Sequence, residues 1–110
     1  EPELGVLKDI RDYLESKKDK IYEEIRNYPP PIPACDLQFN YLLEERARIS
    51  RELSRVDALI TQDLRRKDRI KSIDEFIASS TYINDEMEQR IRSALKKAES
   101  ELDLQPGQDA

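Results

Sequence analysis

The amino-acid sequence predicts an all-α protein, an antiparallel three-helix bundle or helical hairpin with coiled-coil-like packing. Three observations support this fold class. Apolar residues recur at spacings of three and four along nearly the whole chain, which is typical of amphipathic helices. Prolines interrupt this pattern once, and no alternating run favours a strand. The 110 residues are 37% hydrophobic and 39% charged, which fits a single helical domain over residues 1–103.

The first predicted helix covers residues 3–28. Its apolar residues follow the helical spacing, beginning with Leu4, Leu7 and Ile10. Four prolines then follow within five residues and predict a stiff corner over residues 29–34. The helix ends there because each proline disfavours the helical conformation of the residue before it and cannot donate a backbone hydrogen bond.

The second predicted helix covers residues 36–70, with Asp36 as its N-cap. Its apolar residues form a coiled-coil seam without proline or glycine, and the helix would be about 50 Å long. It would exceed the first helix by roughly 12 Å. We therefore expect its end, around Ile60, Leu64 and Ile70, to be left uncovered by the first helix.

The third predicted helix covers residues 73–103 and follows a very short turn. Its start is indicated by Ser72-Ile73-Asp74-Glu75, which has the form of a capping box, in which two side chains satisfy each other's backbone donors. Residues 104–110 are predicted to be a flexible C-terminal tail.

A break in the third helix is expected near residues 79–83. Ser79-Ser80-Thr81 favours a turn, and Asn84 resembles a second N-cap. The preferred prediction is a short helix over 73–79 followed by a longer one over 84–103. One unbroken helix is the alternative.

The residues that are missing exclude several kinds of chemistry. The chain has no His and one Cys, which excludes imidazole-based catalysis, His-ligated zinc and an internal disulfide. Its two glycines, Gly5 and Gly107, lie near the ends, so no glycine-rich loop can hold a phosphate group. We therefore predict no enzyme, no catalytic or metal-binding residue and no cofactor. A cytoplasmic location without membrane contact is expected, because no apolar run matches a signal peptide or a membrane span.

The leading functional hypothesis is a non-enzymatic helical module for protein–protein interaction, or an adaptor, that self-associates as a homodimer. The wide apolar face of the second predicted helix supports it. Its expected apolar anchors are Leu53, Val56, Leu59, Ile60 and Leu64. Arginines beside them would give orientation and specificity: Arg51, Arg55, Arg65 and Arg66. The alternative is a monomer whose surface leucines have no binding role.

The second functional hypothesis is an accessory nucleic-acid-binding protein. Residues 44–71 contain nine basic and six acidic side chains, the basic ones being densest at the end of the second predicted helix. The candidate phosphate-binding residues are Arg65, Arg66, Lys67, Arg69 and Lys71. The isoelectric point near 4.9 and the lack of interleaved aromatic residues make nucleic acid an unlikely partner. A structural alternative is that a helix C-terminus attracts these cations.

Two further features have functional and structural interpretations. Cys35 precedes the predicted N-cap, where helix N–H groups favour a thiolate, but no basic residue lies between Arg26 and Arg46 to assist. A packed side chain is the favoured interpretation. Pro30-Pro31-Ile32-Pro33 has the Pro-x-x-Pro spacing of ligands of SH3 domains, but its helix-tethered ends favour a simple connector.

Overall fold

The computed structural model describes residues 2–103, with the side chains of residues 3–97 and 100. Within this range the chain forms helices and no strand, which confirms the all-α prediction. The helices are α1 (Pro2–Arg26), α2 (Leu37–Thr61), α3 (Arg66–Ser79) and α4 (Asp85–Asp103). The three-helix arrangement is not confirmed, because the described residues form four helices. The predicted tail over residues 104–110 lies outside the described residues.

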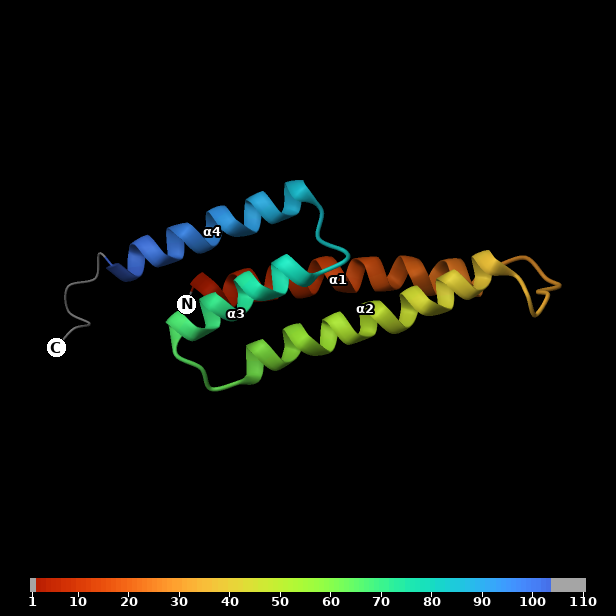
Figure 1. The fold of residues 1–110 in the computed structure, drawn as a ribbon, viewed down its shortest axis with the longest axis horizontal. Coiled ribbons are helices and arrows are strands. Elements are labelled where there is room, and N and C mark those ends of the chain that lie inside the picture. The colour runs from red at the N-terminus through yellow and green to blue at the C-terminus, as the bar shows by residue number, and fades with distance from the viewer. Residues whose placement is uncertain (1, 104–110) are drawn as a thin grey trace.

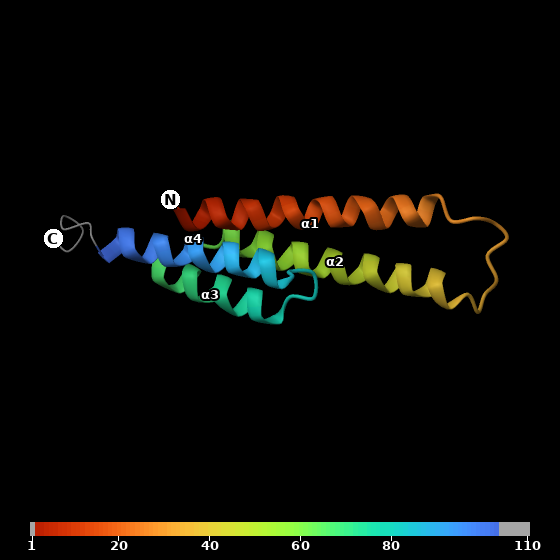
Figure 2. The same ribbon diagram turned by 90° about the horizontal axis from the view of Figure 1, so that it is seen from above.

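An antiparallel hairpin of α1 and α2 forms the long axis of the molecule. Each of the two helices has 25 residues, and the molecule measures 66 × 27 × 18 Å. Figures 1 and 2 show that α3 and α4 lie only along the half of the hairpin near the N-terminus. The half that ends in the proline corner projects beyond them. We call this projecting half, residues 17–44, the hairpin tip.

The hydrophobic core lies in the half of the molecule where all four helices meet. α1 contacts each of the other three helices. The buried residues come from the apolar stripe of each helix, as the periodicity predicts, and include Leu7, Ile10, Leu14, Ile49, Leu53, Val56, Ile70, Ile73, Phe76, Ile77, Ile91 and Leu95. Removal of this apolar surface from water is the main force that holds the helices together.

The proline corner joins α1 to α2 as predicted. The Asp36 side chain accepts a hydrogen bond of 2.9 Å from the Phe39 N–H, which confirms Asp36 as the N-cap of α2. The Tyr28 hydroxyl donates to the same carboxylate at 2.8 Å, and the Tyr28 ring meets the Phe39 ring edge-on with centroids 5.0 Å apart. Ile32, in contrast, stays exposed in the corner.

The prediction of one helix over residues 36–70 is wrong. α2 ends at Thr61, and α3 begins at Arg66 after a short turn. The Gln62 carbonyl oxygen in this turn accepts from the Leu64 N–H at 3.1 Å and from Arg69 Nη2 at 3.4 Å. The turn thus satisfies a backbone acceptor that a continuous helix would have paired internally.

Burial of apolar residues explains why the chain turns back after Thr61. The turn places Ile70, Ile73 and Phe76 in the core, where each is at least nine-tenths buried. A straight extension would project these residues past the start of α1 and leave them in water. The uncovered end expected around Ile60, Leu64 and Ile70 therefore does not exist, since α1 and α2 are equally long and α3 returns along them.

The second half of the chain contains one wrong helix start and one correct break. Ser72 lies inside α3, so the capping-box pattern does not begin a helix here. The break near residues 79–83 is confirmed, because α3 ends at Ser79 and α4 begins at Asp85. Asn84 caps α4, since its Oδ1 accepts from the Met87 N–H at 2.8 Å.

Candidate interaction surfaces

Four of the five predicted interface residues lie in or against the core of the chain itself. Leu53 and Val56 are buried, and Leu59 and Ile60 are half-buried against the same core. Leu64 is half-buried in the turn after α2. In this fold these side chains offer little apolar surface to a second molecule, because α3 folds back over the end of α2.

The predicted orienting arginines of α2 differ in their contacts. Arg55 Nη2 donates to the Ser79 hydroxyl oxygen at 2.9 Å, and its guanidinium lies 4.8 Å from the centroid of the Phe76 ring. It therefore links α2 to the end of α3. Arg51 is exposed to solvent.

The five candidate phosphate-binding residues separate into two groups. Arg66 and Arg69 contact Glu3 in the first turn of α1. Arg65, Lys67 and Lys71 are exposed. Because α3 begins at Arg66, these cations lie at a helix start, so the structural alternative that placed them at a helix C-terminus is wrong.

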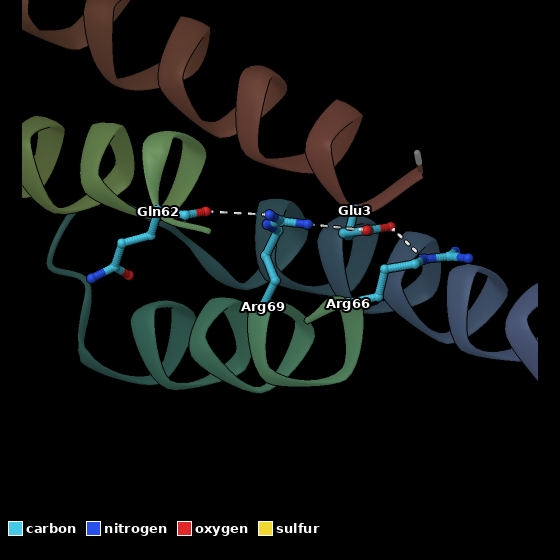
Figure 3. A network of polar contacts seen from close by, with 4 residues as sticks. All are labelled: Glu3, Gln62, Arg66 and Arg69. Carbon is cyan, nitrogen blue, oxygen red and sulfur yellow. Dashed lines mark hydrogen bonds and ion pairs between the residues drawn. The ribbon is translucent and has the colours of Figure 1, made fainter. Parts of the chain in front are cut away.

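A buried ion-pair network joins α1, α3 and the turn after α2 at the end of the molecule away from the corner. Figure 3 shows the fully buried Glu3 carboxylate between the guanidinium groups of Arg66 and Arg69. Arg66 Nε lies 3.2 Å from Glu3 Oε2, and Arg69 Nη1 lies 3.4 Å from Oε1. Arg69 also reaches the Gln62 carbonyl. Arg66 and Arg69 thus face inward and hold α3 against α1.

One face of α2 is covered along only part of its length. Six residues share this face by helical spacing: Leu37, Tyr41, Glu45, Arg48, Glu52 and Arg55. The Glu52 carboxylate accepts from the Ser80 hydroxyl and, at 3.0 Å, from the Thr81 N–H. The Tyr82 hydroxyl donates to the Glu45 carbonyl at 3.0 Å. The loop between α3 and α4 therefore covers this face as far as Glu45 and no further.

Beyond Glu45 the same face is apolar and exposed. Leu37 is 83% exposed and Tyr41 is 53% exposed. A groove of about 670 Å³ lies between α1 and α2 in the same tip, and its lining includes Lys20, Glu24 and Leu42. We call Leu37, Tyr41 and this groove the tip surface.

Sequence reasoning places Tyr41 on the wide apolar face of the second predicted helix, but it names neither Tyr41 nor Leu37 as an anchor of the interface. The signal available was their i, i+4 spacing and their position off the coiled-coil seam. That signal could not reveal exposure, because the residues that cover the rest of this face come from the distant loop at Ser80 to Tyr82.

A second groove lies between α3 and α4. It has a volume of about 630 Å³, and four basic residues line it: Lys67, Lys71, Arg92 and Lys96. Arg92 donates from Nε to Glu88 at 2.9 Å and also pairs with Asp74. These hydrogen bonds, that to Glu88 first, raise the pKa of Arg92. Two of the candidate phosphate-binding residues, Lys67 and Lys71, therefore line this groove together with Lys96. All three lysines are exposed.

The remaining shifted titratable groups have structural causes. The hydrogen bond from the Phe39 N–H, followed by that from Tyr28, lowers the pKa of Asp36. The bond to Asp36 in turn raises the pKa of Tyr28. Burial, followed by the nearby Glu45 carboxylate, raises the pKa of Tyr82. Each shift belongs to a helix cap or a loop anchor.

Comparison of the chain with protein-family models, curated proteins and solved structures finds no match.

Across the part of the chain that the structure describes, no three metal-ligating side chains come together in a way that could hold a metal ion. None of the described helices combines the length and the apolar character needed to cross a bilayer. Cys35 is a free, exposed thiol.

Proposed function

We propose that this chain is a non-enzymatic helical interaction module that self-associates, and that two copies meet at the tip surface. The observation that supports the proposal is the exposure of Leu37 and Tyr41 at one end of a face of α2 whose middle part, from Glu45 to Glu52, contacts the loop between α3 and α4. Exposed apolar side chains that lie close together are a common feature of protein–protein interfaces.

A second copy is a suitable occupant because the tip surface has both apolar residues and both signs of charge. Lys20 lies in the same groove as Glu23 and Glu24. In a two-fold symmetric dimer the same patch of each copy is in contact. The patch must therefore carry both positive and negative charges, so that opposite charges of the two copies can lie against each other. An antiparallel pairing of two tips can place Lys20 of one copy opposite a glutamate of the other while both copies of Leu37 become buried.

The size of the tip surface predicts a weak dimer. The loop between α3 and α4 contacts α1 through the Tyr13 hydroxyl, which donates to the Tyr82 carbonyl at 3.0 Å. From Tyr13 to Arg26 the uncovered face is about 20 Å long and two helices wide, about 400 Å² per copy. Two copies together would bury on the order of 800 Å², less than the roughly 1,200 Å² at the lower limit of stable complexes. We therefore expect dissociation at micromolar rather than nanomolar concentration.

A non-enzymatic role is supported by the arrangement of the titratable groups. Catalytic sites bring groups with shifted pKa values together in a cleft. Here Asp36 and Tyr28 form a helix cap, whereas Tyr82 and Arg92 lie on other parts of the molecule. Such scattered groups fit a binding protein better than a catalyst.

Sedimentation equilibrium tests the proposal, with protein from about 10 to about 500 μM, which brackets the affinity expected of a small interface. The expected result is a rise in average mass from 12.9 kDa toward twice that value. Leu37→Asp should abolish the rise, because it places two carboxylates in the buried centre of the contact.

Two tyrosines on different sides of the hairpin tip test which side forms the contact between copies. Tyr41→Ser removes an aromatic ring from the tip surface. Tyr22→Ser removes one from the opposite side of the same tip, since Tyr22 lies nine residues, about two and a half turns, after Tyr13. Only Tyr41→Ser should weaken association. A constant mass of 12.9 kDa at every concentration, or an equal effect of the two substitutions, would overturn the proposal.

A further inference from the structure

We propose that the groove between α3 and α4 binds an acidic amphipathic segment of a partner protein. The groove lies at the opposite end of the molecule from the hairpin tip, so this inference is independent of the proposed self-association. It rests on the charge of the groove and on the spacing of its exposed lysines.

The groove is basic although the chain as a whole is acidic. Four cations and two carboxylates line it, in a chain whose formal net charge is −5. Arg92 is paired with Asp74 and with Glu88 outside the groove. The other three cations are Lys67, Lys71 and Lys96. They are exposed, and among the described residues they form no ion pair. Their exposed charges can attract an anionic partner.

The direction of α3 adds to this positive potential. Lys67 lies in the first turn of α3, where the helix dipole is positive, and the N-cap residue Arg65 makes no side-chain capping bond. A lysine is unfavourable at a helix start, and an anionic side chain from a partner would relieve that unfavourable interaction.

Spacing and apolar surface favour an acidic helix as the ligand. Lys67 and Lys71 are four residues apart on α3, about 6 Å along the axis, which matches carboxylates four residues apart on a partner helix. Ile70 and Leu95 also line the groove but are each only 5% exposed. Apolar side chains of an amphipathic segment would therefore pack mainly against the methylene groups of the lysines.

The same groove is poorly suited to nucleic acid. Asp68 and Asp74 interrupt its basic surface, and a continuous phosphate backbone would have to pass them, whereas a helix can place its carboxylates opposite the lysines alone. No aromatic residue is among its lining residues, so bases have no ring on which to stack. These features favour the acidic segment over the nucleic acid that the sequence offers as an alternative partner.

Fluorescence polarisation with defined synthetic probes tests the inference. The first probe is a labelled helical peptide with glutamates at i and i+4 and leucines between them, and the second replaces each glutamate with glutamine. The chain should bind the first probe, and binding of the second should be weaker by a factor of about 2 to 25, because each of the two exposed ion pairs contributes a factor of roughly 1.4 to 5.

Two double variants with the same net charge distinguish the groove from general attraction. Lys67→Gln with Lys96→Gln removes two lysines of the groove. Lys8→Gln with Lys97→Gln removes two exposed lysines that do not line it. The groove variant should bind the glutamate peptide about 5-fold more weakly, and the control variant should bind as the wild type does. Far-ultraviolet circular dichroism should give the same helix content for all three proteins.

Three results would overturn the inference. One is the absence of binding to the glutamate peptide, and another is an equal loss of affinity in the two double variants. The third is tighter binding of duplex DNA or RNA than of the peptide, which would assign the groove to nucleic acid instead.

Discussion

Replacing Glu3 with alanine should cost this protein a large part of its stability. The substitution removes the carboxylate that lies 3.2 Å from Arg66 Nε and 3.4 Å from Arg69 Nη1. Removal of one partner from a buried ion pair costs about 3–5 kcal/mol, because the remaining charge stays buried without compensation. Arg69 is 8% exposed and cannot easily reach water, whereas Arg66 is only half-buried and can turn outward.

The lower end of that range is the value expected here. Because Arg66 can regain water and Arg69 keeps the Gln62 carbonyl, we expect a loss of about 3 kcal/mol in the free energy of unfolding. A domain is typically stable by roughly 5–15 kcal/mol, so the variant should still fold but unfold at a much lower urea concentration.

Urea denaturation followed by circular dichroism measures this loss. Glu23→Ala is the matched control, since Glu23 is an exposed glutamate of the same helix and its removal should change stability by less than about 0.5 kcal/mol. Combining Glu3→Ala with Arg69→Met should destabilise less than the sum of the two single changes, because no unpaired charge is then left at Arg69. If Glu3→Ala behaves like Glu23→Ala, the reasoning on the buried network is refuted.

Three other perturbations have expected outcomes. Ile73→Val should lower the unfolding free energy by about 0.5–1.5 kcal/mol in urea titrations, because Ile73 is fully buried, and no change would show a loosely packed core. Tyr82→Phe should cost about 1 kcal/mol by thermal unfolding, since it removes the hydrogen bond to the Glu45 carbonyl, and an unchanged melting curve would contradict that anchor. The lowered pKa of Asp36 means that its ionised form stabilises the fold: the contribution is complete above the unfolded pKa and disappears as the pH falls through the folded one. Urea midpoints of Asp36→Ala should therefore fall less than those of the wild type between about pH 5 and about pH 2, and equal losses would count against the cap.

Local features of the chain could be predicted because their causes are local. The prolines that follow Tyr28 end α1 whatever surrounds them, since proline restricts its own backbone and that of the preceding residue. Asp36 and Asn84 cap helices through bonds to residues three positions away. The break after Ser79 follows from residues that favour turns over helix interiors.

The end of α2 could not be predicted in this way. No proline or glycine lies between Thr61 and Arg66, so the local pattern favours a continuous helix. The break occurs because α3 must return along α1 to bury Ile73, and because Arg69 then meets Glu3, 66 residues away in the chain. Both causes are contacts between distant segments.

The helical class, the corner and the caps follow from the amino-acid pattern alone, because residues that are near each other in the chain produce them. Tertiary structure decided which side of each helix remains available to a partner. It turned Arg66 and Arg69 inward, buried Val56, and left Leu37 and Lys67 at the surface. The physical reason is that helical spacing specifies which residues share a face, whereas exposure of that face depends on which distant segment packs against it.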